Sequence, residues 1–498
     1  MLRTSSYTIF VDLPDTDDFV LLVHGYTGAH DRVSRHVAGY LRRLEPAAPA
    51  PLHGEWQSPH GTATIDAGYA PSEKTVASLV KRGYLTSMSV TEEEGHFARI
   101  AKRLHGQRVA AGPSYIFMPT YDCNLRCSYC FQDYMRTNPR FARLLRRIEP
   151  EMIERIFAAL PELEAAYGRQ PGAARSIGFF GGEPLLAVNH ATVSHIIGRA
   201  KSMGPARIWA VSNATELAAY DDLLGPDGIG AIQVTLDGPP AEHDKRRIRA
   251  DGGGTFDAIA SNIDRCLARG VSISVRLNVD RNNINELPAL ADEMNRRGWS
   301  EHTGFSVYAA PIRPANAQTD VATTFDSWEL NQALESMHRE MPSSDIIRSQ
   351  DDGLMNRARQ VFDDRTDPIP EFRTSFCSAH TTMYIFDPFG DIYACWERTG
   401  DARIRIGNVA DDGRIHLEGP MQKLWRTRTV ASNPTCRKCR YALHCGGGCA
   451  VLAEGQSGRF HSNYCDGFAE RFRHSVAEAY QESLTGIKRR RAEAITDL

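Results

Sequence analysis

The chain has 498 residues, more than one ordinary hydrophobic core accommodates, and it therefore fits two to four domains. Its hydrophobic content of 42%, charged content of 24% and formal net charge of -3 are typical of a globular protein and argue against a broad nucleic-acid-binding or membrane-binding surface. No run of about 18 apolar residues is present, and residues 1–19 carry acids where a signal peptide needs an apolar stretch. We therefore expect a cytoplasmic protein without a nucleic-acid or membrane partner.

The 11 cysteines are unevenly distributed along the chain. Ten of them lie within residues 123–130 and 377–465. Only Cys266 stands apart, in a helix-like segment where a thiol serves as a small apolar core residue. Structural disulfides are rare in a reducing compartment, so the two groups favour metal binding or catalysis.

Residues 1–108 are predicted to form a small α+β domain. Residues 7–12 and 19–25 have the pattern of strands, and residues 55–72 are typical of a loop. Helical periodicity and capping signals predict helices over residues 31–44, 71–85 and 91–106. Strands followed by three helices resemble the winged-helix-like peptide-recognition modules of peptide-modifying enzymes. A structural cap on the catalytic domain is the alternative.

Residues 112–310 alternate between strand-like and helix-like segments. This alternation predicts parallel strands joined by helical crossovers, and about six strands suit a partial (β/α)6 barrel better than a closed eight-stranded one. Functional side chains are then expected at the carboxyl ends of the strands. The predicted strands are residues 114–120, 176–182, 207–213, 229–238, 272–280 and 304–310.

Three further segments complete the predicted organisation. Residues 311–370 are polar and less regular, and we interpret them as a bridge. Residues 371–470 are rich in Cys and Gly, with a predicted hairpin over residues 381–396, so this domain is expected to depend on bound metal rather than on a large apolar core. Residues 471–498 form a C-terminal helix and charged tail. The expected fold class is thus α/β, with a small α+β domain before the partial barrel and a Cys-rich domain after it.

The first cysteine group has the spacing C-x3-C-x2-C, at Cys123, Cys127 and Cys130. These positions share one face of a helix, but Pro119 and Asp122 favour a loop after a strand. A structural zinc site needs four ligands, whereas this segment offers three thiols and no nearby histidine. Three thiolates can also hold a four-iron cluster, which leaves one iron open to a substrate.

With Tyr129 before the third cysteine, this segment resembles the C-x3-C-x-aromatic-C motif of the radical S-adenosylmethionine (SAM) family. The resemblance implies that the catalytic cysteines Cys123, Cys127 and Cys130 hold a 4Fe-4S cluster whose open iron binds SAM. It also implies that reductive cleavage of SAM gives a 5′-deoxyadenosyl radical, which abstracts hydrogen from an unactivated C–H bond.

Further motifs of the same family follow in the expected order. Residues 180–184 read FGGEP, and residues 235–239 read TLDGP, similar to the family's SLDGP. For each lone polar residue, such as His243, a structural hydrogen bond is the alternative. The resemblance implies that SAM is contacted by Tyr129, Gly181, Gly182, Glu183, Pro184, Ser212, Asn213, Thr235, Asp237, Arg247 and Asn278, with SAM or substrate also near Arg276.

The second group has seven cysteines in the pattern C-x12-G-x4-C, then C-x2-C-x5-C-x3-C, then C. Two closed four-thiol zinc sites would need eight. The pattern resembles the SPASM domain, which carries auxiliary clusters in radical SAM peptide and protein maturases. By that resemblance Cys377, Cys395 and Cys449 hold auxiliary cluster I, with an open iron or a ligand such as His380. Auxiliary cluster II is held by Cys436, Cys439, Cys445 and Cys465, which brings the expectation to three 4Fe-4S clusters.

These resemblances predict a maturase that installs a thioether, C–C or C–O crosslink, or a related oxidation, in a ribosomally made precursor peptide. A reducing partner such as flavodoxin or ferredoxin is implied. One alternative is an anaerobic sulfatase-maturing, formylglycine-forming enzyme, but that family carries Asp after the second SPASM cysteine, where this chain has Trp396 and Glu397. A second alternative is a non-catalytic metal-binding or electron-transfer protein, which would need no SAM pocket. Candidate general bases are Asp133, Tyr134 and Glu397.

Overall fold

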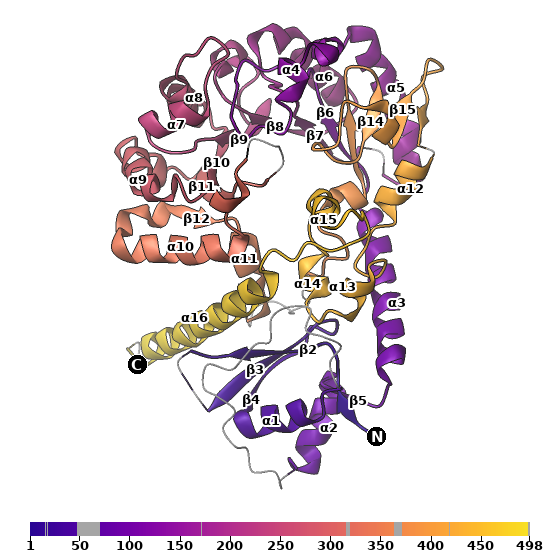
Figure 1. The fold of residues 1–498 in the computed structure, drawn as a ribbon, viewed down its shortest axis with the longest axis vertical. Coiled ribbons are helices and arrows are strands. Elements are labelled where there is room, and N and C mark those ends of the chain that lie inside the picture. The colour runs from indigo at the N-terminus through magenta and orange to yellow at the C-terminus, as the bar shows by residue number, and fades with distance from the viewer. Residues whose placement is uncertain are drawn as a thin grey trace. The chain divides into compact units, whose positions relative to one another are not determined.

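The computed structural model describes residues 1–46 except 15 and 17, and residues 70–170, 172–314, 319–362, 371–417 and 419–496 (Figure 1). The chain forms two compact units. Unit 1 comprises Met1–Gln107, Asp351–Cys377 and Arg428–Leu498, and unit 2 comprises Arg108–Gln350 and Ser378–Thr427. The predicted Cys-rich segment 371–470 therefore contributes to both units. No helix in the described ranges is long and apolar enough to cross a membrane.

Unit 2 is built on parallel strands that follow the order of the chain. All six predicted strands are present, which confirms the α/β partial-barrel prediction. A further short strand, β12 (Ile347–Ser349), extends the parallel array beside the sixth strand, within the predicted bridge. The six strands are β6 (Ser114–Phe117), β7 (Arg175–Phe179), β8 (Ala206–Ser212), β9 (Ile229–Thr235), β10 (Ser272–Val279) and β11 (Phe305–Pro311).

The Cys-rich segment continues the same sheet on the other side. Strand β13 (Met383–Phe386) pairs in parallel with β6, and β14 (Asp391–Tyr393) returns antiparallel to β13, which forms the predicted hairpin. Strands β15 (Gly407–Val409) and β16 (Ile415–His416) complete an 11-stranded sheet. Gly390 adopts φ +78° in the hairpin turn, a conformation that glycine reaches without strain.

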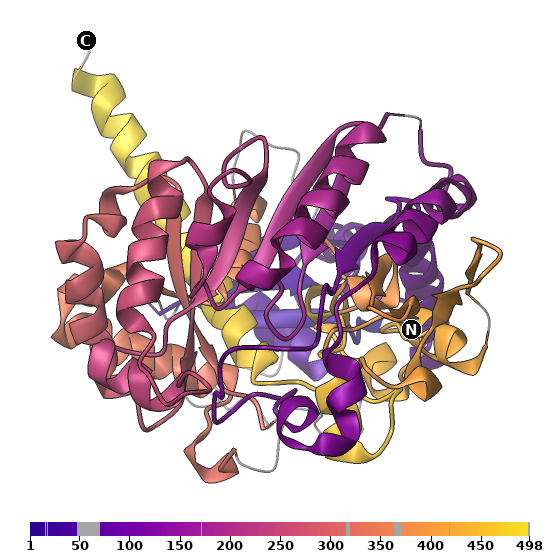
Figure 2. The same cartoon turned by 90° about the horizontal axis from the view of Figure 1, so that it is seen from above.

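The helices of unit 2 cover the outer face of this curved sheet (Figures 1 and 2). The longer helices bury apolar side chains, and in α8 these include Ile259, Ile263 and the completely buried Cys266, which confirms the predicted core thiol. The helices are α4 (Tyr134–Thr137), α5 (Pro150–Ala166), α6 (His190–Ser202), α7 (Pro240–Arg246), α8 (Phe256–Ala268), α9 (Leu287–Arg296), α10 (Ser327–Glu340) and α12 (Pro420–Arg426).

The N-terminal part of unit 1 is a three-stranded antiparallel sheet in the order β2-β3-β4, followed by helices. The prediction of a helix from residue 31 is wrong at its start, because β4 (His30–Ser34) pairs with β3 and Ser34 then caps α1. Most of the predicted loop 55–72 lies outside the described residues. The remaining elements are β1 (Arg3–Thr4), β2 (Thr8–Asp12), β3 (Phe19–His24), β5 (Leu85–Thr86), α1 (Arg35–Arg43), α2 (Glu73–Arg82) and α3 (Val90–Val109).

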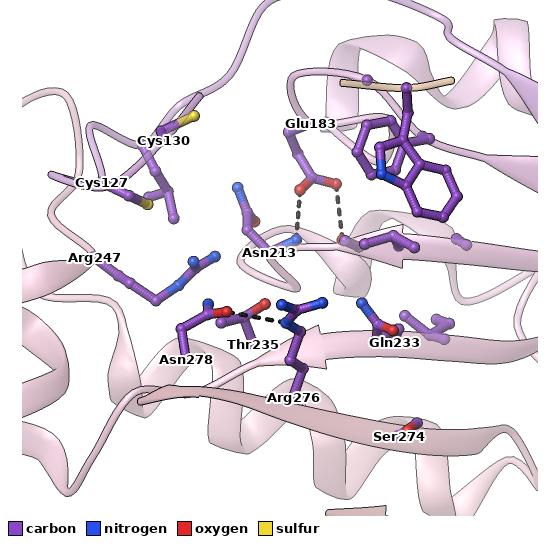
Figure 3. Close-up of a pocket in the computed structure, with 18 of the residues that line it drawn as sticks. Cys127, Cys130, Glu183, Asn213, Gln233, Thr235, Arg247, Ser274, Arg276 and Asn278 are labelled. Atoms are coloured by element: carbon purple, nitrogen blue, oxygen red, sulfur yellow. Dashed lines mark hydrogen bonds between the residues drawn. The ribbon is translucent and has the colours of Figure 1, made fainter. Parts of the chain in front are cut away.

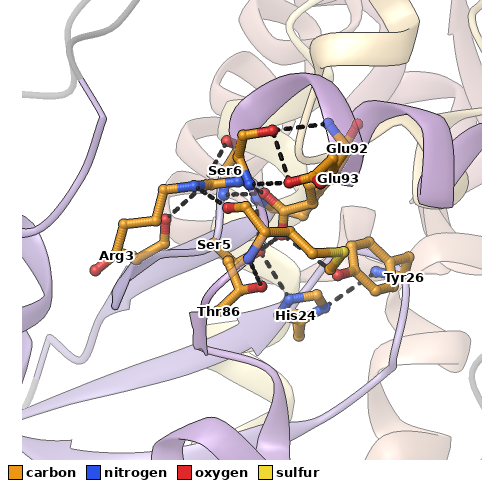
Figure 4. A network of polar contacts seen from close by, with 12 residues as sticks. Arg3, Ser5, Ser6, His24, Tyr26, Thr86, Glu92 and Glu93 are labelled. Carbon is orange, nitrogen blue, oxygen red and sulfur yellow. Dashed lines mark hydrogen bonds and ion pairs between the residues drawn. The ribbon is translucent and has the colours of Figure 1, made fainter. Parts of the chain in front are cut away.

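A buried polar network joins the N-terminal strands to α3 (Figure 4). The Glu93 carboxylate is completely buried and forms an ion pair with Arg3 at 2.8 Å. It also accepts hydrogen bonds from the Ser5 hydroxyl at 2.5 Å, the Ser6 amide at 3.1 Å and the Tyr26 hydroxyl at 3.3 Å. These donors replace the water that the carboxylate loses on burial, and they fix α3 against the sheet.

The rest of unit 1 packs on the same N-terminal sheet. Ile9 and Val23 share an apolar cluster with Leu354, Phe472 and Val476. The C-terminal helix predicted from residue 471 is present and begins slightly earlier, at residue 468. The helices of this part are α11 (Asp352–Val361), α13 (Pro434–Lys438), α14 (Ala442–Cys445), α15 (Ala450–Ser457) and α16 (Phe468–Thr496).

Candidate functional site

The first cysteine group lies in a loop that follows β6 and lines a cavity of about 670 Å³ in unit 2. The loop is held by backbone hydrogen bonds to residues 248–250, which include Arg126 N to Ile248 O at 2.7 Å. Burial raises the pKa of the Cys123 thiol to about 12 and that of Cys127 to about 11. A thiolate at these positions therefore needs a positive partner, such as iron or a guanidinium.

The glycine pair of the FGGEP segment allows this segment to pack directly on the cysteine loop. A Cβ atom on Gly181 would lie 2.4 Å from Thr120 O, and one on Gly182 would lie 2.2 Å from Asp122 O. Two backbone bonds join the same segments, from Gly182 N to Thr120 O at 3.2 Å and from Glu183 N to Asp122 O at 2.7 Å. Only glycine permits this approach of backbone to backbone.

Glu183 is almost completely buried at the carboxyl end of β7 (Figure 3). Its carboxylate accepts hydrogen bonds from the Ser212 hydroxyl at 2.8 Å, Leu185 N at 2.8 Å and Asn213 N at 2.5 Å. Burial raises the pKa of Glu183 to about 7, although these donors act in the opposite direction. A cation arriving in the cavity would favour the charged form of this carboxyl group.

Asn213 connects the end of β8 to the cysteine loop. Its side-chain amide donates to Asn124 Oδ1 at 2.8 Å and lies 3.7 Å from Cys123 Sγ. Its Oδ1 accepts from the hydroxyl of Thr215 at 2.7 Å. Ser212 and Asn213, which the family resemblance predicts as SAM contacts, thus lie beside both Glu183 and the cysteines.

Tyr129 is the centre of a second polar network. Its hydroxyl donates to the Asp237 carboxylate and accepts from Arg247 Nη1 at 2.8 Å and Asn278 Nδ2 at 3.2 Å. Asp237 Oδ1 also accepts from Asn278 N at 3.1 Å. This network brings together the cysteine loop, residues that follow β9 and α7, and Asn278 on β10. Thr235, at the end of β9, lines the same cavity.

His243 does not line the cavity and has structural partners. Its ring nitrogens contact Asp237 N at 3.2 Å and the Thr255 hydroxyl at 3.0 Å, and that hydroxyl donates to Arg247 O at 2.7 Å. Burial lowers the pKa of His243 well below its usual value, so the ring is neutral. His243 is therefore held by structural hydrogen bonds, which is the alternative that the sequence analysis gave for this residue.

Three buried donors around the cysteine loop lack a hydrogen-bond partner within the described ranges. They are Gln132 Nε2, Arg136 Nε and Arg247 Nε, and all three residues line the cavity. Arg136 Nη2 also donates to Cys130 Sγ at 3.1 Å. Orphaned donors beside three thiols are suited to an anionic, acceptor-rich group such as an iron–sulfur cluster. Sequence reasoning missed Gln132 and Arg136, and only their closeness to Cys130 could have indicated them.

The cavity continues along the strands, away from the cysteines. Phe180 stacks on Trp396, with ring centroids 5.1 Å apart, and Glu397 follows on the same wall. Of the three candidate bases, Glu397 lines the cavity, whereas Tyr134 is exposed and Asp133 is not among the lining residues. Residues that sequence reasoning missed here are Trp209, Gln233, Ser274 and Arg313.

In unit 1, four cysteines of the second group line one small cavity. Cys436, Cys439, Cys445 and Cys465 come from α13, its end, α14 and the loop before α16. Burial and the mutual repulsion of thiolates raise the pKa of Cys436 well above its usual value. Asn463 Nδ2 donates to Cys465 Sγ at 3.1 Å. Four cysteines around one small cavity suit a closed 4Fe-4S cluster.

The turn between Cys445 and Cys449 is made by three glycines, all with positive φ between 73° and 84°. Arg428 is buried behind it and donates to Gly447 O at 3.2 Å and Gly448 O at 3.0 Å. Burial lowers the pKa of Arg428, whereas the surrounding thiols of Cys436, Cys449, Cys377 and Cys445 raise it. The buried Arg428 guanidinium thus interacts electrostatically with unit 1 cysteines of both predicted auxiliary clusters.

The predicted ligands of auxiliary cluster I are divided between the units. Cys377 and Cys449 belong to unit 1, and Cys395 belongs to unit 2. His380 is buried in unit 2, where its Nδ1 lies 3.0 Å from Trp425 O and its ring stacks on Trp425. Across the described parts of the chain, no three His, Cys, Asp or Glu side chains are arranged to hold a single metal ion.

Comparisons with known proteins agree with this geometry. The model of the radical SAM superfamily matches residues 117–294. The mycofactocin maturase MftC of Mycobacterium tuberculosis (strain H37Rv) is 25% identical over 347 residues, which cover 66% of this chain and 76% of the relative. GTP 3′,8-cyclase 1 of Pseudomonas aeruginosa is 30% identical over 184 residues, or 35% of this chain and 49% of that protein.

The fold also resembles a solved structure, that of native anSMEcpe with bound AdoMet. The TM-score is 0.55 at 13% identity, over 75% of this chain and 100% of that chain. A radical SAM domain implies a 4Fe-4S cluster and SAM as cofactors. Residues 117–294 match the radical SAM superfamily, and this match together with the similarity to a maturase indicates that the protein is an enzyme with a radical SAM domain.

Proposed function

We propose that this enzyme is a peptide maturase that modifies a ribosomally made precursor peptide by radical chemistry. The observation that carries the proposal is the convergence of three cysteines, Glu183 and two polar networks at the carboxyl edge of a parallel sheet, beside an open cavity. The similarity to mycofactocin maturases, over two thirds of this chain, supports a peptide as the substrate. The bond formed is a thioether, C–C or C–O crosslink, or a related oxidation.

Cys123, Cys127 and Cys130 are the proposed ligands of the SAM-binding cluster. Two observations support a cluster at these cysteines: all three line one cavity, and Gln132 and Arg136 beside them have buried donors without a hydrogen-bond partner. When bound, the cluster and SAM supply a 5′-deoxyadenosyl radical that abstracts hydrogen from a C–H bond. The residues around the cavity bind SAM, orient the peptide and exclude water from the radical.

The proposed SAM contacts divide by chemistry. Glu183 offers a carboxylate to the SAM ammonium, and Arg247 offers its unpartnered Nε to an anionic acceptor such as the SAM carboxylate. The glycines of the FGGEP segment leave room for close approach of the ligand. The full proposed set is Tyr129, Gly181, Gly182, Glu183, Pro184, Ser212, Asn213, Thr235, Asp237, Arg247 and Asn278.

Two auxiliary 4Fe-4S clusters are proposed in addition. The grouping of Cys436, Cys439, Cys445 and Cys465 in unit 1 supports auxiliary cluster II. Cys377, Cys395 and Cys449 are the proposed ligands of auxiliary cluster I, completed by an open iron or by a ligand such as His380. A reducing partner such as flavodoxin or ferredoxin supplies electrons.

The N-terminal segment 1–108 is the proposed recognition site for the precursor peptide. Among the described residues, β2 and β4 of its three-stranded sheet pair only with the central β3, so each outer strand has an edge to which an extended peptide could add. The proposed domains are otherwise those of the sequence: barrel 112–310, bridge 311–370, SPASM domain 371–470 and tail 471–498.

The test is an anaerobic reconstitution followed by iron and sulfide analysis and an assay for 5′-deoxyadenosine formed from SAM with dithionite. We expect about twelve irons per chain and detectable cleavage, which is lost in the Cys123→Ala, Cys127→Ala and Cys130→Ala variants. Cys266→Ala is the matched control, because this buried thiol belongs to the core of α8 and should leave both measurements unchanged. Zinc in place of iron, without cleavage, would refute the proposal.

A second candidate function is formylglycine formation. The observation that favours it is that Glu397, two positions after Cys395, lines the cavity and could serve as the base. Mass spectrometry of the modified peptide separates the two functions. A thioether or carbon–carbon crosslink removes hydrogen and keeps sulfur, whereas formylglycine made from cysteine loses the sulfur.

A further inference from the structure

The wall of the cavity formed by β10 is polar in a position where a barrel strand is ordinarily apolar. Side chains alternate along a strand, and the interior of a closed barrel is usually filled by branched apolar residues. The buried Val275, Leu277 and Val279 of β10 do not line the cavity, whereas the buried Ile273 borders it. The other four residues of β10 that line the cavity are polar: Ser272, Ser274, Arg276 and Asn278.

Arg276 projects from this wall into the cavity (Figure 3). Its Nε donates to Asn278 Oδ1 at 3.0 Å, which fixes the direction of the side chain. Within the described ranges its two terminal nitrogens have neither a hydrogen bond nor an ion pair. The guanidinium therefore presents two terminal nitrogens, with four N–H groups, and a full positive charge to a ligand that enters the cavity.

Gln233, on the neighbouring strand β9, adds a neutral donor to the same wall (Figure 3). The Tyr308 hydroxyl donates to Gln233 Oε1 at 3.0 Å, so the amide oxygen is occupied and the Nε2 group remains as a donor. Ser274 also lines the cavity and lies opposite Gln233 in the register of the two strands. The wall is thus rich in donors, which favours an anionic ligand.

The cysteine loop has its own cation, which makes Arg276 available for a different ligand. Arg247 bonds to Tyr129 at 2.8 Å and keeps an unpartnered Nε beside the cysteines. Among the residues the structure describes, two carboxylates line the cavity, Glu183 and Glu397, and neither forms an ion pair with Arg276. Asn278 connects Arg276 to Tyr129, with Asn278 Nδ2 at 3.2 Å from the Tyr129 hydroxyl.

From this arrangement we propose that the peptide substrate carries a carboxylate bound by Arg276, with Gln233 and Ser274 as supporting donors. This inference rests on the proposed function and specifies its substrate: the modified segment is acidic or lies at a C-terminus. Because Asn278 joins Arg276 to the cysteine-loop network, a carboxylate held there positions the neighbouring carbon atoms close to the site of radical formation. Arg276 is a specificity-determining residue and takes no part in SAM cleavage.

Three acetylated tripeptides test the proposal by calorimetric titration of the reconstituted, SAM-saturated full chain. Acetyl-Ala-Ala-Gly as the free acid offers a C-terminal carboxylate, acetyl-Ala-Asp-Gly amide offers a side-chain carboxylate, and acetyl-Ala-Ala-Gly amide is neutral. We expect at least one acidic peptide to bind about tenfold more tightly than the neutral one. Which acidic peptide binds more tightly identifies the source of the carboxylate.

The Arg276→Gln variant should lose this preference and keep its affinity for SAM and its formation of 5′-deoxyadenosine without peptide. Arg276→Lys, which keeps the charge and loses the fork of donors, should retain part of the preference and serves if the Gln variant does not fold. The matched control is Arg281→Gln, because Arg281 is paired with Glu329 outside the cavity. It should bind all three peptides like the parent enzyme.

Three results would overturn the inference. One is equal binding of acidic and neutral peptides by the parent enzyme. Another is a carboxylate preference that survives Arg276→Gln. The last is a loss of SAM affinity in Arg276→Gln, which would assign this guanidinium to the cofactor. In each case SAM cleavage by the parent enzyme would still support the proposed function, so the two failures are distinguishable.

Discussion

Replacement of Gly182 by alanine tests whether the close packing of the FGGEP segment on the cysteine loop is needed for stability and for iron binding. The new Cβ atom would lie 2.2 Å from Asp122 O and 2.3 Å from Tyr121 O. Both contacts are with backbone, which has no rotamer to yield, and van der Waals contact requires more than 3 Å. Either the FGGEP segment or the cysteine loop must shift.

The cost of such overpacking is typically about 1–3 kcal/mol, and we expect the upper part of this range because the loop is fixed on both sides by hydrogen bonds. Thermal unfolding of the full chain should show a fall in Tm of several degrees. Iron bound by the first site should fall in parallel, because Asp122 immediately precedes Cys123.

Gly198→Ala is the matched control for this experiment. Gly198 lies inside α6, and a Cβ atom there would meet nothing within 4 Å. Alanine is the better helix former by about 1 kcal/mol, so this variant should raise Tm slightly and keep its iron. A Gly182→Ala protein with the Tm and iron content of the parent would refute the reasoning, because it would mean that the close backbone contact is not maintained in solution.

Three further predictions concern other parts of the chain. Glu93→Gln removes the charge that pairs with Arg3 in a completely buried site and should lower the free energy of unfolding by about 2–4 kcal/mol, measured by urea titration; an unchanged midpoint would contradict it. Burial, and to a lesser extent Asp391, raises the pKa of Asp387 to about 7, so the folded chain holds a proton that the unfolded chain releases near pH 4. The free energy of unfolding should therefore fall by a few kcal/mol as the pH rises from about 4 to about 7, and Asp387→Asn should flatten this dependence. If the variant has the same pH profile as the parent, Asp387 is not its source. Cys465→Ala should lower iron from about twelve to about eight per chain and leave peptide-independent SAM cleavage intact, whereas loss of cleavage would show that the two cysteine groups are not independent.

The sequence predicted those parts of the fold that local patterns encode. Strand-like and helix-like segments alternate along residues 112–310, and all six strands predicted from this alternation are present. Strand β4 was missed because the polar residues 30–34 suit a helix and become a strand only by pairing with β3. The pairing of β13 with β6 was equally invisible, since it joins residues about 270 positions apart and no local pattern encodes it.

The candidate site shows the same division. Motif spacing placed the cysteines and Glu183 on one cavity, because successive strand ends of a parallel sheet meet at one edge. The spacing could not show that Gly182 faces the backbone of the cysteine loop, or that Gln132 and Arg136 hold unpartnered donors. Those features depend on side-chain geometry between segments. The donor-rich wall around Arg276 could be predicted only in part, since Gln233 and Ser274 belong to no recognisable sequence motif.

The parallel pairing of β13 with β6 bears on how such enzymes can be recombined. The Cys-rich segment contributes a strand to the central sheet and, through Trp396 and Glu397, part of the cavity wall. This segment therefore cannot be exchanged, by evolution or by engineering, without also replacing part of the cavity wall. A chimaera cut between residues 350 and 378 would leave β6 with an exposed edge, and its aggregation would follow from the open strand rather than from lost iron. Substrate range and auxiliary metal content should consequently change together among homologous enzymes, because one stretch of chain encodes both.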